Sequence, residues 1–271
     1  MGNEKYFEPD YQKLNRQAKR LNGSKGQAGE LLERFLTRGK KREPLNYDPK
    51  LLDDLSALIT SIKKDIDWEQ KLPEASYVVF DTETTGLHPF KGDEIISIGA
   101  VVVEKGKILS EQRFYEMVNP GRPVSPQSEE ITGLNDKILS DKPDFIPVLF
   151  RFLQFAGSRI LVAHNAPFDL AFINNRLGEA IGRRIVNPVI DTVLLTSALY
   201  YALGDYSLEN LAPRFNLSLE GRHNALGDAV IAASLFISLL QELNNMGIRK
   251  LPELSRLFSE ADPAKGYPLI F

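Results

Sequence analysis

Two acidic residues follow directly on a short apolar run. Asp81 and Glu83 come after Tyr77–Phe80, whose aromatic and β-branched residues are typical of a strand. Side chains two positions apart in a strand project from the same face. One face of this segment therefore carries two carboxylates.

Two further acids lie where an apolar core is expected. Asp169 comes after the apolar run Leu161–Ala163, and Pro167 suits the first position of a helix, which places Asp169 in the first helical turn. Asp228 lies on the apolar stripe of a later helix, because apolar residues recur four, seven, eight and eleven positions after it. Taken singly, each acid could be a helix cap or a solvated turn residue. The four together predict a carboxylate cluster.

Such a cluster requires cations, because buried carboxylates are costly to ionise and repel one another. Oxygen ligands without sulfur favour Mg²⁺ or Mn²⁺ over zinc, and the chain contains no cysteine. Two such ions about 4 Å apart hold the attacking and leaving oxygens of an in-line phosphoryl transfer. We therefore expect two Mg²⁺ or Mn²⁺ ions per site and the hydrolysis of a phosphodiester.

His223 is the candidate general base. It precedes Asp228 by five residues, in the segment Gly221–Asn224 that leads into the helix of Asp228. From there its side chain can overhang the acidic cluster. An imidazole titrates near neutrality, which suits a group that takes a proton from water.

Short strands and a few helices must position these residues. A short turn at Glu104–Lys107 joins two of the strands, so the first three strands form an antiparallel meander. Later strands alternate with helical patterns, which predicts a mixed sheet flanked by helices in an α/β domain. The expected strands are Tyr77–Phe80, Ile95–Val103, Ile108–Tyr115, Ile160–Ala163 and the short run Val189–Ile190, and the expected helices are Pro167–Leu177, Thr192–Ala202 and Ala225–Asn244.

The first 72 residues differ from the rest in charge and pattern. Tyr11–Arg42 carries ten basic and two acidic residues, and this segment is either a solvated helical face or arm, or a surface that binds a strand or a protein. Apolar residues at helical spacing predict a helix from about Pro49 to Ile66, and another upstream that ends near Gly39. We therefore divide the chain into a basic, mostly helical extension (1–72), a main domain (73–246) and a C-terminal tail (247–271).

The bulk composition excludes several classes of site. The net charge is −3 and the pI is about 5.8, so contact with phosphate must come from local patches. Without cysteine the chain forms no disulfide, thiolate metal site or cysteine nucleophile. The polar start lacks a signal-peptide pattern, and no run is expected to supply the roughly 20 apolar residues that span a membrane. A cytoplasmic location without membrane contact is the expectation.

Three motifs of this sequence resemble those of the DEDDh exonucleases. The motifs are Phe80–Gly86 (FDTETTG), His164–Asp169 (HNAPFD) and His223–Asp228 (HNALGD). Their order and separations are similar to those of this family, which includes proofreading subunits of bacterial replicative polymerases and ribonuclease T. The likeness covers about residues 74 to 245. A histidine at position 223 argues against the sister branch that uses tyrosine as base.

This resemblance implies a fold and a role for individual residues. The implied fold is ribonuclease H-like, with a mixed five-stranded sheet. The implied catalytic residues are the metal ligands Asp81, Glu83, Asp169 and Asp228 and the general base His223. The residues implied to bind substrate are Thr84, Thr85, Gly86, Leu87, His164, Asn165 and Phe168. The alternatives are an ordinary turn at 84–87 and contacts to backbone groups for His164 and Asn165.

Two further segments are similar to segments of the family. Ile131–Leu134 resembles a family segment that lies near the end of the substrate strand. Leu87, in the turn after the first strand, could wedge against the last base of that strand. Asp191 resembles a further family acid, although it equally suits the capping position of a helix that begins at Thr192.

The function that the resemblance implies is 3′-to-5′ exonuclease activity on single-stranded DNA. The products would be nucleoside 5′-monophosphates, and the setting would be proofreading or repair. The expected partner is the 3′ end of a strand, with DNA favoured over RNA, and residues 1–72 are the candidate contact for a polymerase or another protein. Two alternatives stay open: an exoribonuclease that trims RNA 3′ ends, and a catalytically silent module that binds nucleic acid or protein.

Overall fold

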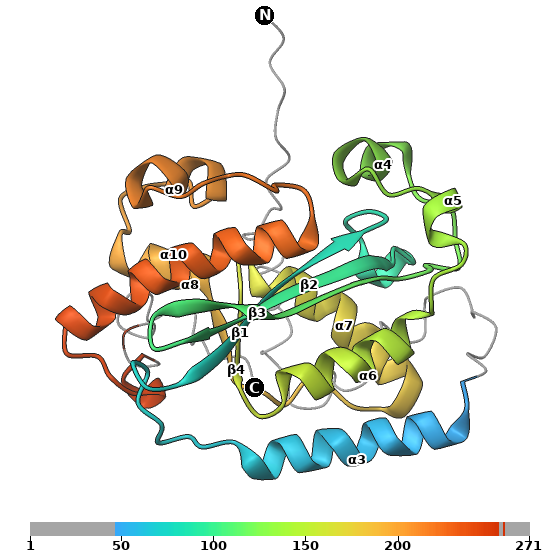
Figure 1. Ribbon diagram of the computed structural model, residues 1–271, viewed down its shortest axis with the longest axis horizontal. Helices are drawn as coiled ribbons and strands as arrows, with labels where there is room; N and C mark the ends of the chain where they lie inside the picture. Colours follow the sequence, from blue (N-terminus) through green and yellow to red (C-terminus); the bar gives the residue numbers. More distant parts are fainter. Residues whose placement is uncertain (1–46, 255–256, 258–271) are drawn as a thin grey trace, which may run out of the picture. The chain divides into compact units, whose positions relative to one another are not determined.

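A computed structural model describes residues 47–254 and 257 of the chain. Its centre is a five-stranded sheet with the strand order β3-β2-β1-β4-β5 (Figure 1). β1 runs antiparallel to β2 and parallel to β4, so the sheet is mixed, as the sequence predicts. The strands are β1 (Ser76–Thr84), β2 (Ile95–Glu104), β3 (Lys107–Met117), β4 (Ile160–Ala163) and β5 (Val189–Asp191).

The first strand is longer than its apolar run. The sequence predicts a strand that ends at Phe80, whereas β1 continues to Thr84 because its backbone stays paired with β2 through the acidic residues. Asp81 lies opposite Gly99, and Glu83 lies opposite Ser97. Both acids are therefore held inside a strand rather than in the turn that follows it.

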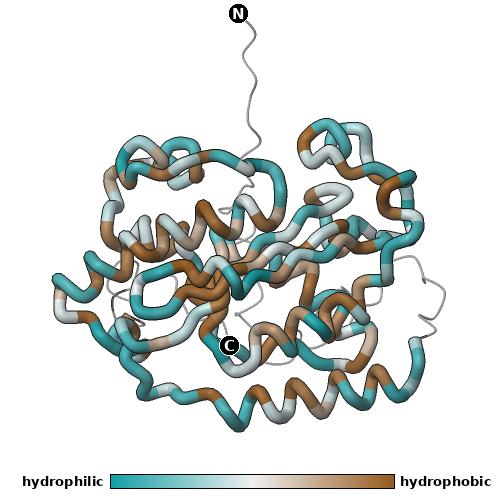
Figure 2. The backbone as a smooth tube through the Cα atoms, in the orientation of Figure 1, coloured by the Kyte–Doolittle hydropathy of each residue, from teal (hydrophilic) through white to brown (hydrophobic). Residues whose placement is uncertain are grey.

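The two faces of the sheet bury different side chains of β1. Tyr77 and Val79 pack with α10 (Ala225–Asn245), whereas Val78 and Phe80 pack with helices on the opposite face. Figure 2 shows the hydrophobic residues concentrated in these central strands. Because side chains alternate along a strand, the carboxylates of 81 and 83 project toward the α10 face, and Thr82 projects toward the other.

Three helices cover the face opposite α10 (Figure 1). They are α3 (Pro49–Asp65), α6 (Phe145–Ala156) and α7 (Ala166–Ile181). The predicted helix from Pro49 is present. Asp48 caps it, and its residues Leu55, Ile59 and Ile62 are buried in the same core as the sheet. The helix predicted upstream, near Gly39, lies outside the described residues.

The remaining elements are shorter. They are the 3₁₀ turn η1 (Pro89–Lys91) and the helices α4 (Pro126–Thr132), α5 (Asp136–Leu139), α8 (Thr192–Leu199) and α9 (Leu208–Phe215). The sequence did not predict α4, α5 or α6. α7 continues past Gly178 to Ile181 and ends at Gly182, whose φ of 67° is the left-handed conformation that glycine adopts easily. α8 ends at Leu199, three residues before the predicted Ala202.

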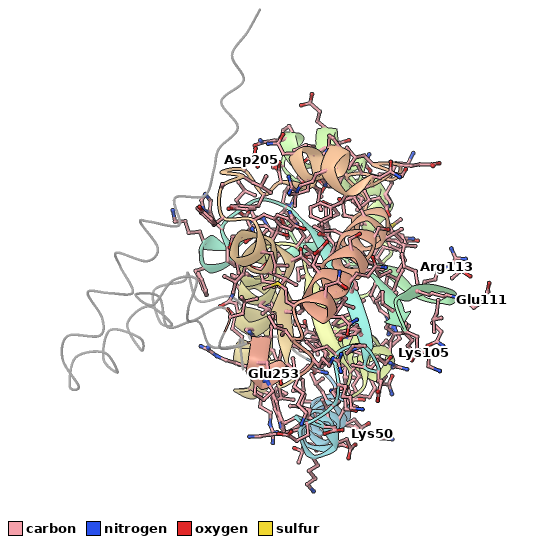
Figure 3. All side chains as sticks on the ribbon, turned by 90° about the vertical axis from the view of Figure 1, so that its left-hand side faces the viewer. Lys50, Lys105, Glu111, Arg113, Asp205 and Glu253 are labelled. Carbon is pink, nitrogen blue, oxygen red and sulfur yellow. The ribbon has the colours of Figure 1, made fainter. Side chains whose placement is uncertain are left out.

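β3 is an edge strand and carries mostly polar side chains. Figure 3 shows Glu111 and Arg113 projecting outward from this edge, with Lys105 at the turn that precedes the strand. Charged side chains on an edge strand discourage pairing with a second chain. The expectation that no run is long and apolar enough to span a membrane is wrong for α10, by length and composition. Half of its apolar window is buried in the core against the sheet and the neighbouring helices.

Candidate active site

Three carboxylates converge beside the far end of β1. One oxygen from each of Asp81, Glu83 and Asp228 lies within 4.8 Å of the other two. The first two come from adjacent same-face positions of β1, and the third comes from the first turn of α10, the helix that packs on that face. Carboxylates so close together form a set of hard oxygen ligands suited to a divalent cation.

Gly99 allows the helix to come this close. It lies opposite Asp81 on β2, and a Cβ atom at this position would lie 2.1 Å from the backbone nitrogen of Leu226 and 2.2 Å from the carbonyl carbon of Ala225. The first turn of α10 therefore rests directly on the backbone of β2. Asp228 reaches the two strand acids because no side chain separates the helix from the strand.

The substitution Gly99→Ala tests this packing. We expect it to push the start of α10 away from β2, to lower the free energy of unfolding by about 1–3 kcal/mol, and to weaken Mn²⁺ binding as Asp228 retreats. The measurements are urea unfolding and a Mn²⁺ titration. The matched control is Gly178→Ala in α7, an exposed helical position where an added Cβ meets only one atom, at 3.9 Å. This variant should raise the free energy of unfolding by about 1 kcal/mol, because alanine favours a helix over glycine. Equal behaviour of the two variants would contradict the role of Gly99.

Asp169 is held separately from these three acids. Its Oδ1 accepts hydrogen bonds from the backbone nitrogen of Thr82 at 3.0 Å and from the Thr82 hydroxyl at 2.6 Å. Thr82 projects toward α7 because it lies between the two acids in the alternating strand. Asp169 is nonetheless near enough to Asp81 for its negative charge to raise the pKa of that carboxyl. The four acids are thus gathered, but in unequal roles.

Burial and mutual repulsion make all four acids reluctant to ionise without a counter-ion. Burial raises the pKa of Asp81 well above its usual range, and the charges of Asp169, Asp228 and Glu83 raise it further. Burial likewise raises the pKa of Glu83 and of Asp169 to about 7 each. The pKa of Asp228 is also raised by burial, although the neighbouring Arg222 opposes this rise. A bound divalent cation would favour the ionised forms.

These shifts predict that metal stabilises the fold more at higher pH. Glu83 and Asp169 stay protonated in the metal-free fold up to about pH 7, whereas in the unfolded chain they ionise near pH 4. Between these values the unfolded chain binds fewer protons, so the metal-free fold loses stability as pH rises. Cations compete with those protons, so the Mg²⁺-induced rise in melting temperature should be small at pH 5.5 and largest above pH 7.5.

Thermal melts in Mg²⁺ and in chelator at each pH measure this effect. At each pH, the melting temperature in chelator is subtracted from that in Mg²⁺. The titration of His164 also changes stability with pH, but it does so equally in both melts and therefore cancels. The Asp228→Asn variant should lose most of the Mg²⁺-induced rise. A rise that is equal at pH 5.5 and 7.5 would show that these acids do not bind the ion.

The loop before α10 supplies two groups that contact Asp228. Its Oδ2 accepts hydrogen bonds from the backbone nitrogen of His223 at 3.0 Å and from Nη1 of Arg222 at 2.8 Å, and the second contact is also an ion pair. The His223 side chain is exposed, and its φ of 65° turns the backbone sharply at the mouth of the site. Sequence reasoning missed Arg222, although its place directly before His223 was a signal that could have found it.

His164 and Asn165 lie directly after β4 and contact the start of α8. The Nδ1 atom of His164 is 2.8 Å from the Thr192 hydroxyl, and burial lowers the pKa of this imidazole to about 4, so the ring is neutral near pH 7. The backbone nitrogen of Asn165 donates to Asp191, which also caps α8 by accepting from the nitrogen of Val193. Asp191 thus takes the capping position that the sequence allowed, whereas the substrate roles of His164 and Asn165 stay predictions.

The turn after β1 is fixed by Asp93. Its Oδ2 accepts from the backbone nitrogen of His88 at 3.0 Å, and its Oδ1 lies 3.3 Å from the Thr85 hydroxyl. A Cβ at Gly86 would lie 2.5 Å from the Asp93 carboxylate, so only glycine fits there without a shift. Leu87, the next residue, is 57% exposed.

Helix α4 lies beside this turn. The backbone oxygen of Thr84 accepts a hydrogen bond from Ser128 of α4 at 2.7 Å, which places α4 beside the turn. Ile131 on the same helix is 46% exposed. Phe168, in the first turn of α7, packs on Phe172 with ring centroids 5.2 Å apart. The turn after β1 and α4 are thus in contact, while the start of α7 carries Asp169.

Comparison with known proteins identifies the family of this chain. A family model described as an exonuclease, RNase T, matches residues 78–236, which is more than half of the chain. A DNA polymerase III subunit epsilon-like protein of Rhodobacter capsulatus is 42% identical over 182 residues, 66% of this chain and 26% of that protein. A PolC-type DNA polymerase III of Caldanaerobacter subterraneus is 39% identical over 189 residues, 70% of this chain and 13% of that protein. The chain spans about a quarter or less of the length of these relatives.

Solved structures share the fold. Exonuclease X, determined in complex with a 5′-overhanging duplex DNA, covers 67% of this chain and 99% of its own, with 28% identity and a TM-score of 0.53. The nuclease domain of 3′hExo, a DEDDh family member bound to rAMP, covers 62% of this chain and 93% of its own, with 18% identity and a TM-score of 0.54. The predicted ribonuclease H-like α/β fold is confirmed.

Proposed function

The chain belongs to the RNase T family of exonucleases, and from this premise we propose that it removes nucleotides one at a time from the 3′ end of single-stranded DNA. The products are nucleoside 5′-monophosphates. The observation that carries this proposal is the convergence of three carboxylates from β1 and α10 within 4.8 Å. Such a cluster is unfavourable on its own and is made favourable by divalent cations, which phosphodiester hydrolysis uses.

The donor set fits Mg²⁺ or Mn²⁺. Asp81, Glu83 and Asp228 offer carboxylate oxygens, and the Oδ1 atom of Asp228 is buried without a hydrogen-bond partner among the described residues. A buried carboxylate oxygen without a partner costs free energy that a cation would recover. Asp169, fixed by Thr82, would act at the edge of the same site. Two ions held there would supply Lewis acidity and neutralise the charge that develops on the phosphate oxygens.

His223 is proposed to take the proton from the attacking water. Its backbone is tied to Asp228, and its exposed imidazole lies at the mouth of the site, where a water beside the terminal phosphate would be within reach. The turn at Thr84–Leu87 would hold the terminal nucleotide. Gly86 makes room for the Asp93 carboxylate that fixes this turn, and Leu87 would contact the last base. His164 would act through its contact with the Thr192 hydroxyl at the start of α8.

The biological setting is inferred from the relatives. Two of them are named as DNA polymerase III proteins, and one solved neighbour was determined with DNA. We propose a role in DNA proofreading or repair in the cytoplasm. Docking to a polymerase or another protein through residues 1–72 stays a prediction, because residues 1–46 lie outside the described part of the chain.

A labelled-strand assay tests direction and substrate together. A single-stranded DNA and an RNA of the same sequence, each labelled at the 5′ end, are incubated with Mg²⁺ or with chelator. We expect a ladder of DNA products that shortens stepwise from the 3′ end in Mg²⁺ only, and slower loss of the RNA. Immediate release of the labelled 5′ nucleotide would contradict the direction. Preference for the RNA would favour the exoribonuclease, and no loss of either strand would favour a silent binding module.

A further inference from the structure

Arg222 is a cation built into the acidic site. Its Nη1 lies 2.8 Å from Oδ2 of Asp228, and its Nε lies 2.7 Å from Oε1 of Glu209 on α9. The Arg222 side chain is 28% exposed and that of Asp228 is 5% exposed, so the contact is shielded from water. One guanidinium therefore bridges a catalytic acid and an acid on a different helix.

The two oxygens of Asp228 have different surroundings. Oδ2 accepts from both Arg222 and the backbone nitrogen of His223. Oδ1 is buried and has no hydrogen-bond partner in the described part of the chain. With Oδ2 engaged on the loop side, Oδ1 is the oxygen left to the cluster of Asp81 and Glu83. The carboxylate can then bind a cation through one oxygen only.

The charge of Arg222 also reaches the rest of the cluster. It opposes the rise in pKa of Asp81, Glu83 and Asp228. A positive charge that stabilises these carboxylates competes with any divalent cation that binds them. Glu209 limits this competition because it pairs with the same guanidinium.

We propose that Arg222, anchored by Glu209, is a positioning residue that restricts Asp228 to one metal-binding oxygen and keeps the affinity for divalent cations low. Arg222 thus fixes the orientation of Asp228 and lowers the affinity of the site for divalent cations. This inference rests on the proposed metal-dependent function and adds a residue that sets the metal affinity. It predicts that removing Arg222 makes metal binding tighter and turnover slower.

The test measures Mn²⁺ binding without substrate, by electron paramagnetic resonance of the free ion, alongside turnover at saturating Mn²⁺. For Arg222→Gln we expect about tenfold tighter Mn²⁺ binding, since a competing charge is removed, and turnover lower by about tenfold or more, since Asp228 is free to rotate. For Arg222→Lys we expect the weak binding of the wild type to return. Turnover should recover only in part, because an ammonium lacks the planar fork that contacts two acids.

Glu209→Gln should change Mn²⁺ affinity in the opposite direction to Arg222→Gln. It leaves the charge of Arg222 uncompensated by α9, so Mn²⁺ binding should weaken by about threefold. A purely structural role of the ion pairs would weaken binding in both Arg222→Gln and Glu209→Gln. The matched control is Arg151→Gln, which removes an exposed Arg–Glu pair between α6 and β3 and should change neither quantity.

Each outcome decides the inference. Weaker or unchanged Mn²⁺ binding in Arg222→Gln overturns it, and so does a rise in KM with unchanged metal affinity, which would place Arg222 on the substrate phosphate. Should Arg222→Gln lose the native melting transition in chelator, Glu209→Gln and Arg222→Lys still carry the test. A wild type that binds Mn²⁺ but digests no strand would instead overturn the proposed function.

Discussion

Asp228→Asn is expected to lower turnover by a factor on the order of 10³ or more while the fold survives, since several kcal/mol of transition-state stabilisation depend on bound cations. The amide oxygen of asparagine can still accept from Arg222 and from the backbone of His223. What is lost is the negative charge and an anionic ligand at the buried Oδ1 position. The metal-free protein should melt at a higher temperature than the wild type, because one of the repelling acids of the cluster is removed.

The measurements are single-turnover digestion of a 5′-labelled strand in Mg²⁺ and thermal melting in chelator. Asp54→Asn on α3 is the matched control, because it makes the same change at an exposed position on the opposite face of the sheet. It should leave both quantities unchanged. Unchanged Mg²⁺-dependent hydrolysis in Asp228→Asn would remove the basis for the active site.

His223→Asn is expected to lower turnover by about 10²–10⁴-fold, the range typical for loss of a general base, with Mn²⁺ affinity retained. Asparagine is the appropriate replacement because residue 223 has a φ of 65°, a left-handed conformation that asparagine tolerates better than alanine does. The backbone nitrogen at 223 then keeps its hydrogen bond to Asp228. The loss should therefore report on the imidazole and not on the position of the metal ligand.

The pH dependence of turnover distinguishes the role of base from that of a contact residue. In the wild type we expect a rise of the rate with pH that the variant lacks over the same range. Added imidazole should restore part of the rate of His223→Asn. A variant with the wild-type pH profile and a rate reduced by less than about threefold would rule out proton transfer by His223.

Much of the fold could be predicted from sequence because its elements have distinct periods. The first three strands form the expected antiparallel meander, and α10 spans Ala225–Asn245 against a predicted Ala225–Asn244. α6 was missed because seven of its twelve residues are buried and it lacks a clear polar face. α4 and α5 were missed because helices of seven and four residues are too short to show a period.

The four acids could be predicted from sequence, but the different hydrogen bonds and ion pairs of Asp169 and Asp228 could not. The spacing of Asp81 and Glu83 places both on one face of β1, because the strand continues through both residues. That Asp169 is held by Thr82 from the other face depends on how α7 packs, which no local pattern encodes. The pairing of Arg222 with Asp228 depends on left-handed backbone at Gly221 and His223. The need for glycine at 99 appears only when α10 is placed on β2.

Anomalous scattering from crystals grown with Mn²⁺ tests most directly whether these acids form a metal site. We predict a strong anomalous peak within bonding distance of Asp81 and of the Oδ1 atom of Asp228, about 2.0–2.2 Å from the nearest oxygens. The peak should vanish in Asp228→Asn crystals grown under the same conditions. Ordered crystals at millimolar Mn²⁺ with no peak between β1 and the first turn of α10 would contradict the account.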